Sequence, residues 1–471
     1  MKTVYTIFFL AVIFHGSAQR IVDYDLVNLD SIKKPLSDYR HTFSAQKDSS
    51  YNSHKNRWNY SILPEITSSY DGKNLNYLGD VLLNLYIPVN NKLKIYGAGR
   101  LGYTNAENQI YTSRMQPTTY FDRLFQDVKS RIIYTPNRYI KLQTGLDKHF
   151  IGQGDRSLLM GDQGIASPFA MIQAKLWKLE YCSIQQILRE GRTGHFRTKG
   201  SSTHFLNFRH KHHFSIGIFE TVTHLIKDTL YNRGFDIEYL NPFTFYRPQE
   251  YSLGSSDNVI LGLNTHVKFG KSVLYGQLVL DEFLLSAIRS RNRWWANKYG
   301  IQIGYKFAKV ADNKSSFLRT ELTLIRPYTF SHLNNSLNYG TQGLPVAHPL
   351  GSNLIEWYSE HVIQTGSWTS QSWFQIYLKG MDPETDSLSY GGDIYQSYIN
   401  RPIGEFGILI GNGEHTVTWQ FGNRTSYALK RKLMEVFVEP RFFITRTKQN
   451  INSQLYLTIG IQSSFGSRLK N

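Results

Sequence analysis

The chain has 471 residues, and its 53 lysines and arginines exceed its 36 aspartates and glutamates, giving a formal net charge of +17. Its single cysteine, Cys182, excludes an internal disulfide framework. A mean hydropathy of −0.37 fits a soluble protein. It also fits a membrane β-barrel, because only the lipid-facing half of each strand must be apolar. The 14% aromatic content, with 31 Tyr and 8 Trp, favours the barrel, whose interfaces carry aromatic girdles.

Residues 1–18 have the pattern of a cleavable signal peptide. Lys2 precedes an apolar run from Val4 to Phe14, and small residues at 16–18 form a cleavage site. The run is too short for an anchoring helix, which needs about 20 apolar residues. No Cys follows the cleavage site, which argues against a lipid-anchored protein. We expect an exported chain that begins at Gln19.

Residues 19–56 differ in composition from the remainder of the chain. They are polar and charged, with only a faint apolar pattern, which suits a periplasmic or plug-like N-terminal segment or a disordered one. From residue 57 to residue 471 the sequence pattern is uniform: short segments of alternating apolar and polar residues are separated by Gly, Asn, Asp and Pro. We therefore expect one barrel over 57–471.

Several runs show the period-2 alternation of strands with one apolar face. From Asn258 to Phe269, apolar residues such as Leu261 alternate with polar ones such as Asn264 and His266. The same alternation occurs over residues 93–103, 140–146, 298–307 and 318–324, and residues 135–137 form a turn signal. The apolar side of each run is expected to face lipid and the polar side the lumen.

The length of these runs decides between two all-β folds. Strands of soluble sandwiches and propellers have about 5–6 residues, whereas crossing an outer membrane obliquely takes about 9–11. At roughly 25 residues per strand and connection, the chain makes an antiparallel transmembrane β-barrel of about 18 strands in the cell outer membrane. The last run, Gln454 to Phe465, ends in an aromatic residue and resembles the C-terminal signal read by the barrel-insertion machinery, although residues 466–471 follow it.

An ordered series of blocks resembles the capsule-assembly Wzi family of outer-membrane proteins. The match runs over roughly residues 130–465, and its last two blocks resemble the form found in Bacteroidetes, which includes the gliding-motility protein RemB. The blocks are Gly145–Gly154 with Ser157–Leu159, Asn241–Arg247 with Glu250, Ser256–Asn258 with Leu261–Leu263, Leu274–Gln277 with Asp281–Phe283, His348–Asn353, and Tyr390–Ile394. Enterobacterial members tend to have Trp where this chain has Ile151.

The resemblance implies a barrel of about eighteen strands with segments folded into its lumen. It also implies lectin-like binding, assembly or attachment of surface or capsular polysaccharide, serving capsule, gliding motility or adhesion, rather than catalysis. A diffusion porin for small or anionic solutes remains the alternative. A barrel enzyme is a weaker alternative, and no motif supports it.

One block combines the residue types that recognise sugars. Aromatic faces pack against sugar rings, while planar donors and carboxylates bind hydroxyls and uronates. Pro242 and Pro248 cannot donate to a strand ladder, so this stretch reads as a shaped loop. A polar lumen network that braces the barrel is an equal alternative. The polysaccharide-binding or lumen candidates are Tyr246, Arg247, Glu250, Asp257 and Asn258.

Other residues are better explained by structure than by chemistry. Asp147, Gly152 and Gly154 are plug or bend candidates, since Gly-x-Gly without a βαβ context is not a nucleotide loop. Adjacent strand residues Asp281 and Glu282 should face opposite sides, which favours a lumen salt bridge or a strand-end position over a catalytic pair. The histidines around residues 204–213 lack carboxylate or thiolate companions, so we expect no metal and no cofactor.

The positive charge indicates which partners to expect. In an exported barrel, a net charge of +17 favours lipopolysaccharide phosphates, outer-membrane lipid and acidic polysaccharide, and not nucleic acid.

Overall fold

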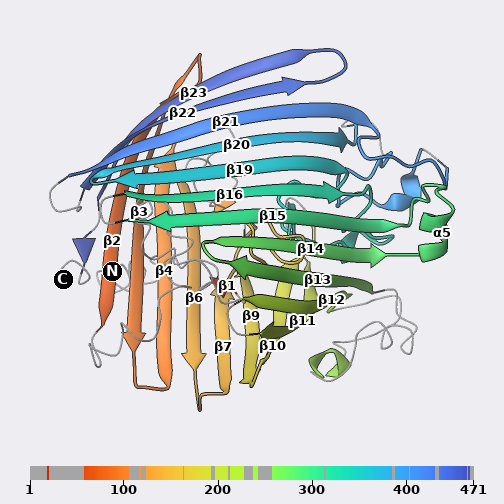
Figure 1. Cartoon of the computed structure of the whole chain (residues 1–471), viewed down its shortest axis with the longest axis horizontal. Coiled ribbons are helices and arrows are strands. Elements are labelled where there is room, and N and C mark those ends of the chain that lie inside the picture. The colour runs from red at the N-terminus through yellow and green to blue at the C-terminus, as the bar shows by residue number, and fades with distance from the viewer. Residues whose placement is uncertain are drawn as a thin grey trace, which may run out of the picture.

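Long antiparallel strands close into a barrel in the computed structural model of the chain (Figure 1). The part of the chain that the structure describes contains eighteen long barrel strands, as the sequence predicts. The described residues are 19–20, 58–105, 116–117, 124–162, 164–191, 197–210, 213–226, 237–241, 257–311, 314–383, 388–402, 404–429, 434–463 and 465–466. The predicted signal peptide and most of the predicted segment 19–56 lie outside them.

All but one of the long strands have at least the length that an oblique membrane crossing requires, and β7 has eight residues. In chain order they are β2 (Asn59–Tyr70), β3 (Leu75–Pro88), β4 (Leu93–Thr104), β6 (Leu124–Tyr134), β7 (Ile140–Asp147), β9 (Ser167–Leu176), β10 (Leu179–Arg189), β11 (Thr198–His210), β12 (Phe214–Leu225), β13 (Asn258–Phe269), β14 (Ser272–Glu282), β15 (Lys298–Val310), β16 (Lys314–Ile325), β19 (Leu354–Thr365), β20 (Trp368–Met381), β21 (Glu414–Leu429), β22 (Met434–Arg446) and β23 (Ile451–Ser463).

The remaining elements are short. They are the strands β1 (Gln19–Arg20), β5 (Gln116–Pro117), β8 (His149–Phe150), β17 (Gly340–Thr341), β18 (Leu344–Pro345) and β24 (Phe465–Gly466), the α-helix α5 (Leu285–Arg289), and the 3₁₀ turns η3 (Ile237–Leu240), η4 (Asn335–Leu337) and η5 (Tyr398–Asn400). Among the described residues, no helix is long and apolar enough to cross a membrane.

The first and last strands close the barrel. β2 pairs with β3 on one side and with β23 and β24 on the other, with Ile66 opposite Ile461 and Ile62 opposite Phe465. The predicted terminal aromatic residue, Phe465, therefore lies in the closing seam. Closure leaves no open sheet edge, which is what a β-structure needs in lipid, where water cannot satisfy free N–H and C=O groups.

Alternation along each strand sorts residues between lipid and lumen, as predicted. In β13, Leu261 points outward and is 37% exposed, whereas Asn264 points inward and is fully buried. Outward residues on other strands are more exposed still, such as Ile303 at 57% and Leu322 at 60%. The apolar exterior is the surface that outer-membrane lipid would cover.

The two ends of the barrel differ in the length of their connections. One end has tight connections, such as residues 89–92, 135–139 and 270–271, and it includes the predicted turn at Pro136. The other end has long connections, such as residues 148–166, 326–353 and 382–413. Outer-membrane barrels place short turns in the periplasm and long loops outside. We accordingly call the second end the extracellular end.

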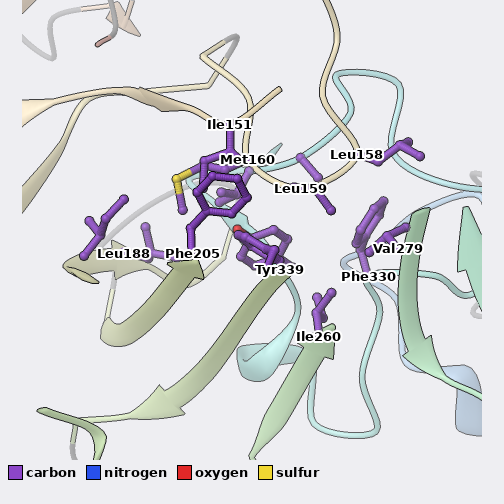
Figure 2. Packing of buried hydrophobic residues seen from close by; sticks show 14 of the residues in the cluster. Ile151, Leu158, Leu159, Met160, Leu188, Phe205, Ile260, Val279, Phe330 and Tyr339 are labelled. Atoms are coloured by element: carbon purple, nitrogen blue, oxygen red, sulfur yellow. The ribbon is translucent and has the colours of Figure 1, made fainter. Parts of the chain in front are cut away.

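Three long connections fold into the lumen and pack on one another. We call them the first plug segment (residues 148–166), the second (326–353) and the third (382–413), within the described residues. Figure 2 shows Leu159 and Met160 of the first beside Phe330 and Tyr339 of the second. The apolar cluster that they share with the wall also contains Ile151, Val346 and Ile394 from the plug, and Cys182, Phe205, Phe219, Ile260 and Val279 from the strands.

Two residues that the sequence analysis named are buried in this cluster. Cys182 is one of them, so its thiol is a packing residue. Ile151 is fully buried in the same cluster. The backbone of β1 pairs in parallel with β8, which brings Gln19 and Arg20 beside the first plug segment.

Candidate functional site

The first plug segment passes so close to the wall that a side chain at either of two glycines would have to displace a wall side chain. Gly152 has a φ of +142°, and a side chain there would collide with the amide of Gln277 on β14. A side chain at Gly154 would collide with the carboxylate of Glu321 on β16. Both predicted bend residues therefore lie where the plug backbone approaches the wall.

Gln277 attaches the first plug segment to β14. Its Nε2 donates to the carbonyl of Ile151 at 2.9 Å, and its Oε1 accepts from the N–H of Leu158 at 2.8 Å. Gln277 faces the lumen and is 4% exposed. A wall side chain thus satisfies backbone groups of an irregular segment that would otherwise be buried without partners.

A buried ion-pair group joins the first two plug segments to the wall. Glu356 of β19 accepts from Arg156 Nη1 at 3.1 Å and from His348 Nε2 at 2.9 Å. Burial alone would lower the pKa of Arg156, but the Glu356 carboxylate reverses this and raises the pKa above its ordinary value, so Arg156 stays charged. The first segment contributes Arg156 and the second His348, so Glu356 locks both.

A second group repeats this arrangement one strand away. Arg319 of β16 donates to Asp155 Oδ1 at 2.7 Å and also pairs with Glu360 of β19. Glu321 Oε1 accepts from the N–H of Asp155 and from the Tyr275 hydroxyl, each at 2.6 Å. Since each charge in this group has a charged or hydrogen-bonding partner, the group holds the plug in one position.

Asp147 braces the entry to the first plug segment. Its Oδ2 accepts from Arg131 Nη2 at 2.7 Å and from Arg131 Nε at 3.0 Å, and both side chains are buried. These two charge-assisted hydrogen bonds, both to one carboxylate oxygen, tie β6 to β7 just before the chain leaves the wall. Asp147 thus lies at the entry to the first plug segment, and its role in anchoring the plug stays a prediction.

The expectation for Asp281 and Glu282 is partly corrected. Alternation predicts that their side chains face opposite sides, but both carboxylates contact Lys298 Nζ, at 3.2 and 3.1 Å. The register of β14 against β15 shifts between Leu280 and Glu282, and this bulge turns both carboxylates toward one lysine. The predicted salt bridge at a strand end is present.

The two sequence blocks His348–Asn353 and Tyr390–Ile394 lie together in the second and third plug segments. Asn353 Nδ2 donates to carbonyls of Gly380, Tyr390 and Asn412. Asp382 accepts from the backbone N–H groups of residues 390, 392 and 393. Burial raises the pKa of Asp382 despite these hydrogen bonds. The blocks therefore form one interlocked turn assembly.

The polysaccharide candidates are not brought together by the described structure. Tyr246, Arg247 and Glu250 lie outside the described residues. Asp257 accepts from the Tyr239 hydroxyl at 2.7 Å, whereas Asn258 donates to the carbonyl of Leu337 in the second plug segment at 2.9 Å. Tyr239 belongs to η3, which packs on the outward-facing residues Val222 and Val259. Asp257 therefore bonds to a residue outside the barrel wall, whereas Asn258 bonds to a plug residue inside it.

An aromatic and basic cluster at the extracellular end was not singled out by the sequence reasoning. Its core is Trp294 and Trp295 from the β14–β15 connection with Tyr398 and Arg401 from the third plug segment. The Trp295 ring centroid lies 4.7 Å from that of Tyr398 and 3.8 Å from the Arg401 guanidinium carbon. The sequence signal was available: three arginines alternate over residues 289–293 and two tryptophans follow.

His332, beside this cluster, is not a charged ligand group. Its ring centroid lies 6.3 Å from that of Tyr398. Burial, followed by the nearby Lys298 charge, lowers the pKa of His332 to about 4, so the ring is neutral near pH 7. No group of three or more His, Cys, Asp or Glu side chains suited to a metal ion occurs among the described residues.

Comparison with known proteins supports the fold. No protein-family model matches the sequence, and comparison with curated proteins finds no significant match. The structure is similar to that of Wzi, an outer membrane protein involved in group 1 capsule assembly in Escherichia coli and described as a carbohydrate-binding β-barrel. That similarity has a TM-score of 0.58 at 12% identity and covers 86% of this chain and 84% of Wzi.

Porins are similar at lower TM-scores. OccAB2 of Acinetobacter baumannii has a TM-score of 0.48 at 7% identity, over 87% of this chain and 98% of its own. OccK8 (OprE) of Pseudomonas aeruginosa has a TM-score of 0.47 at 8% identity, over 87% and 98%. The closed barrel and its likeness to Wzi define this chain as a β-barrel of the outer membrane.

Proposed function

We propose that this protein binds surface or capsular polysaccharide at the outer membrane and serves its assembly or attachment. The observation that carries the proposal is the plug. Three connections enter the lumen, share an apolar cluster with the wall, and are fixed there by buried ion pairs. A barrel built to pass solutes does not need an apolar core in its lumen, whereas a barrel that presents a rigid surface outside the cell does.

The charges inside the lumen argue in the same direction. A pore selective for anionic solutes would line its path with available cations. Here Arg156, Arg319 and Lys298 each contact a carboxylate and are at most 16% exposed at the side chain. These cations neutralise carboxylates of the wall and the plug and are not available to passing solutes. The diffusion-porin alternative is therefore less well supported.

The likeness to Wzi supplies the ligand class for this proposal. We extend carbohydrate binding from that barrel to this one, and with it a lectin-like, non-enzymatic role. The resemblance of blocks 348–353 and 390–394 to the RemB-like branch of Bacteroidetes makes gliding motility or adhesion the process we propose. Lipopolysaccharide and the barrel-insertion machinery are the further partners proposed, and residues 1–18 the export signal.

Deletion and complementation in the native host test the function. Cells without the protein should release surface polymer into the medium, and the wild-type chain should restore retention to parental levels. The comparison requires equal outer-membrane barrel amounts, measured by the shift in gel mobility between unheated and boiled samples. Unchanged polymer retention and unchanged surface adhesion in the deletion strain would contradict the proposal.

A further inference from the structure

Two extracellular connections form one continuous surface. The N–H of Trp295 donates to the carbonyl of Glu405 at 2.9 Å, and the N–H of Gly407 donates to the carbonyl of Asn292 at 3.0 Å. Ile408 N–H donates to Arg293 O at 3.1 Å. These backbone bonds join the β14–β15 connection to the third plug segment. The surface is therefore fixed by the plug and does not consist of independent loops.

Aromatic rings gather on this surface. Trp295 lies at the centre, with the ring centroids of Tyr398, Tyr328 and Trp294 at 4.7, 6.1 and 6.4 Å. Trp294, Trp295 and Tyr398 are all partly exposed, whereas Tyr328 is buried beneath them. The exposed tryptophan–tyrosine group offers flat apolar faces of the kind on which sugar rings pack.

The cations here differ from those in the lumen. Arg289, Arg291 and Arg293 are exposed, and Arg401 is partly exposed above Trp295. Within the described ranges, none of these four arginines forms an ion pair, whereas the lumen cations Arg156, Arg319 and Lys298 do. Glu405 is exposed on the same surface, and Glu282 pairs with Lys298, whose Nζ lies 4.8 Å from the Tyr398 ring centroid. The four arginines outnumber the one carboxylate, Glu405, that has no paired cation here, so this surface is positive.

Arg401 is held in place but not saturated. Its Nη1 donates to the Tyr398 carbonyl at 2.6 Å, and its guanidinium carbon stacks 3.8 Å from the Trp295 ring centroid. Its Nε is buried and has no hydrogen-bond acceptor among the described residues. Stacking fixes the plane of a guanidinium and leaves its edge to bind a carboxylate with two parallel hydrogen bonds.

The backbone around the exposed arginines is unusual as well. Arg291 and Arg293 have φ angles of 54° and 56°, in the left-handed region that non-glycine residues seldom adopt. Conformations of this kind persist where surrounding structure imposes them, and they gather at ligand sites. Arg293 lies in the segment that pairs with residues 405–408, and Arg291 directly precedes that segment.

We propose that this extracellular cluster, formed by Trp294, Trp295, Tyr398 and Arg401 with Arg289, Arg291 and Arg293, binds an acidic sugar unit. The unit carries a carboxylate, as a uronate does, for the arginine edge, and an apolar ring face for the tryptophans. This inference rests on the proposed function and adds to it the site and the charge class of the polymer. A neutral glycan has no anionic group to pair with the arginines. A free phosphate has no apolar face to pack on the aromatic rings.

The experiment measures binding of oligogalacturonate to the purified, detergent-solubilised barrel by titration calorimetry. Wild type should bind it, more weakly as salt rises, because exposed charges are screened. Neutral dextran oligosaccharide of equal length and inorganic phosphate should each bind at least tenfold more weakly. Arg401→Gln and Trp294→Ala should each weaken oligogalacturonate binding about tenfold or more, and all variants must keep the heat-dependent gel shift.

A matched control lies at the other end of the barrel. Arg138 also stacks on an aromatic ring, 4.7 Å from the centroid of Tyr139, but in the short connection 135–139. Arg138→Gln should leave oligogalacturonate binding unchanged. Equal loss in Arg138→Gln and Arg401→Gln would reduce the effect to net charge and overturn the site.

The remaining outcomes separate this inference from the proposed function. Wild-type affinity for oligogalacturonate in both Arg401→Gln and Trp294→Ala overturns the site. Phosphate binding as tight as that of oligogalacturonate overturns the assignment of a sugar, and dextran binding as tight overturns the acidic class. Suppose that cells with Arg401→Gln retain native polymer as wild-type cells do, whereas deletion cells lose it. That result would overturn the site and leave the proposed function standing. Retention in the deletion strain rejects the function itself.

Discussion

Removing the carboxylate of Glu356 should release the plug without opening the barrel wall. The side chain is 1% exposed and accepts from Arg156, His348 and Gln375. Truncation to alanine leaves the Arg156 charge without its partner, and breaking a buried ion pair in this manner costs about 3–5 kcal/mol. Because the Arg156 side chain is 16% exposed, we expect the lower end of that range.

Hydrogen exchange of the plug backbone measures this loss directly. A loss of about 3 kcal/mol in local stability corresponds to roughly 100-fold faster exchange where amides exchange through local opening. In Glu356→Ala, the amides of Ile151 and Gly161, which bond to Met160 and Val346 carbonyls, should show this acceleration. Amides of β22, remote from the plug, should not change.

Two comparison variants define what counts as refutation. Glu356→Gln keeps an acceptor oxygen and should accelerate exchange less than alanine does. Glu414→Ala, at an exposed strand end, should leave plug exchange unchanged. If Glu356→Ala changed plug exchange by less than threefold, or accelerated β22 equally, the ion pair would not be what holds the plug.

Three further changes test other parts of the account. Leu261→Arg places a charge on the lipid-facing surface, at a cost of about 2–4 kcal/mol near the midplane, and should block the heat-dependent gel shift, whereas Leu261→Met should insert normally. Gly391 has a φ of +79°, and a side chain there would collide with the backbone of Tyr328. Gly391→Ala should therefore lower the thermal unfolding midpoint, while Gly404→Ala, with open space around it, should not. Gln277→Leu removes two hydrogen bonds to the plug backbone, at about 1–3 kcal/mol for each group left buried without a partner, and should speed exchange at Leu158; normal exchange there would contradict this.

The strands could be predicted from the sequence because their signal is local. Each alternating run, such as 258–269, shows which of its residues face lipid and which face the lumen, and the number of strands followed from chain length.

Alternation did not show whether a lumen-facing residue contacts water or is covered by a plug. By alternation alone, Asn264 is a lumen position at which Arg would be tolerated. The structure shows Asn264 fully buried and bonded to Gln277 beneath the plug, so Asn264→Arg should be disruptive.

The plug itself could be inferred only through resemblance. Leu158 and Leu159 contact wall residues more than a hundred positions away, and no local period encodes such a contact. The bulge that turns Asp281 and Glu282 toward Lys298 is likewise a property of two strands together. Trp294 and Trp295 were visible as a motif, but their meeting with Tyr398 and Arg401 depends on how two distant connections pair.

Single-channel recording in a planar lipid bilayer tests the central claim most directly, namely that the lumen is plugged and the barrel presents a surface rather than a pore. Purified wild-type protein, verified as a folded barrel by its gel shift, should insert without producing steady open-channel current. Glu356→Ala should add intermittent openings to that silent baseline. A steady conductance from the wild-type barrel, unchanged in the variant, would contradict the account and identify the protein as a diffusion pore.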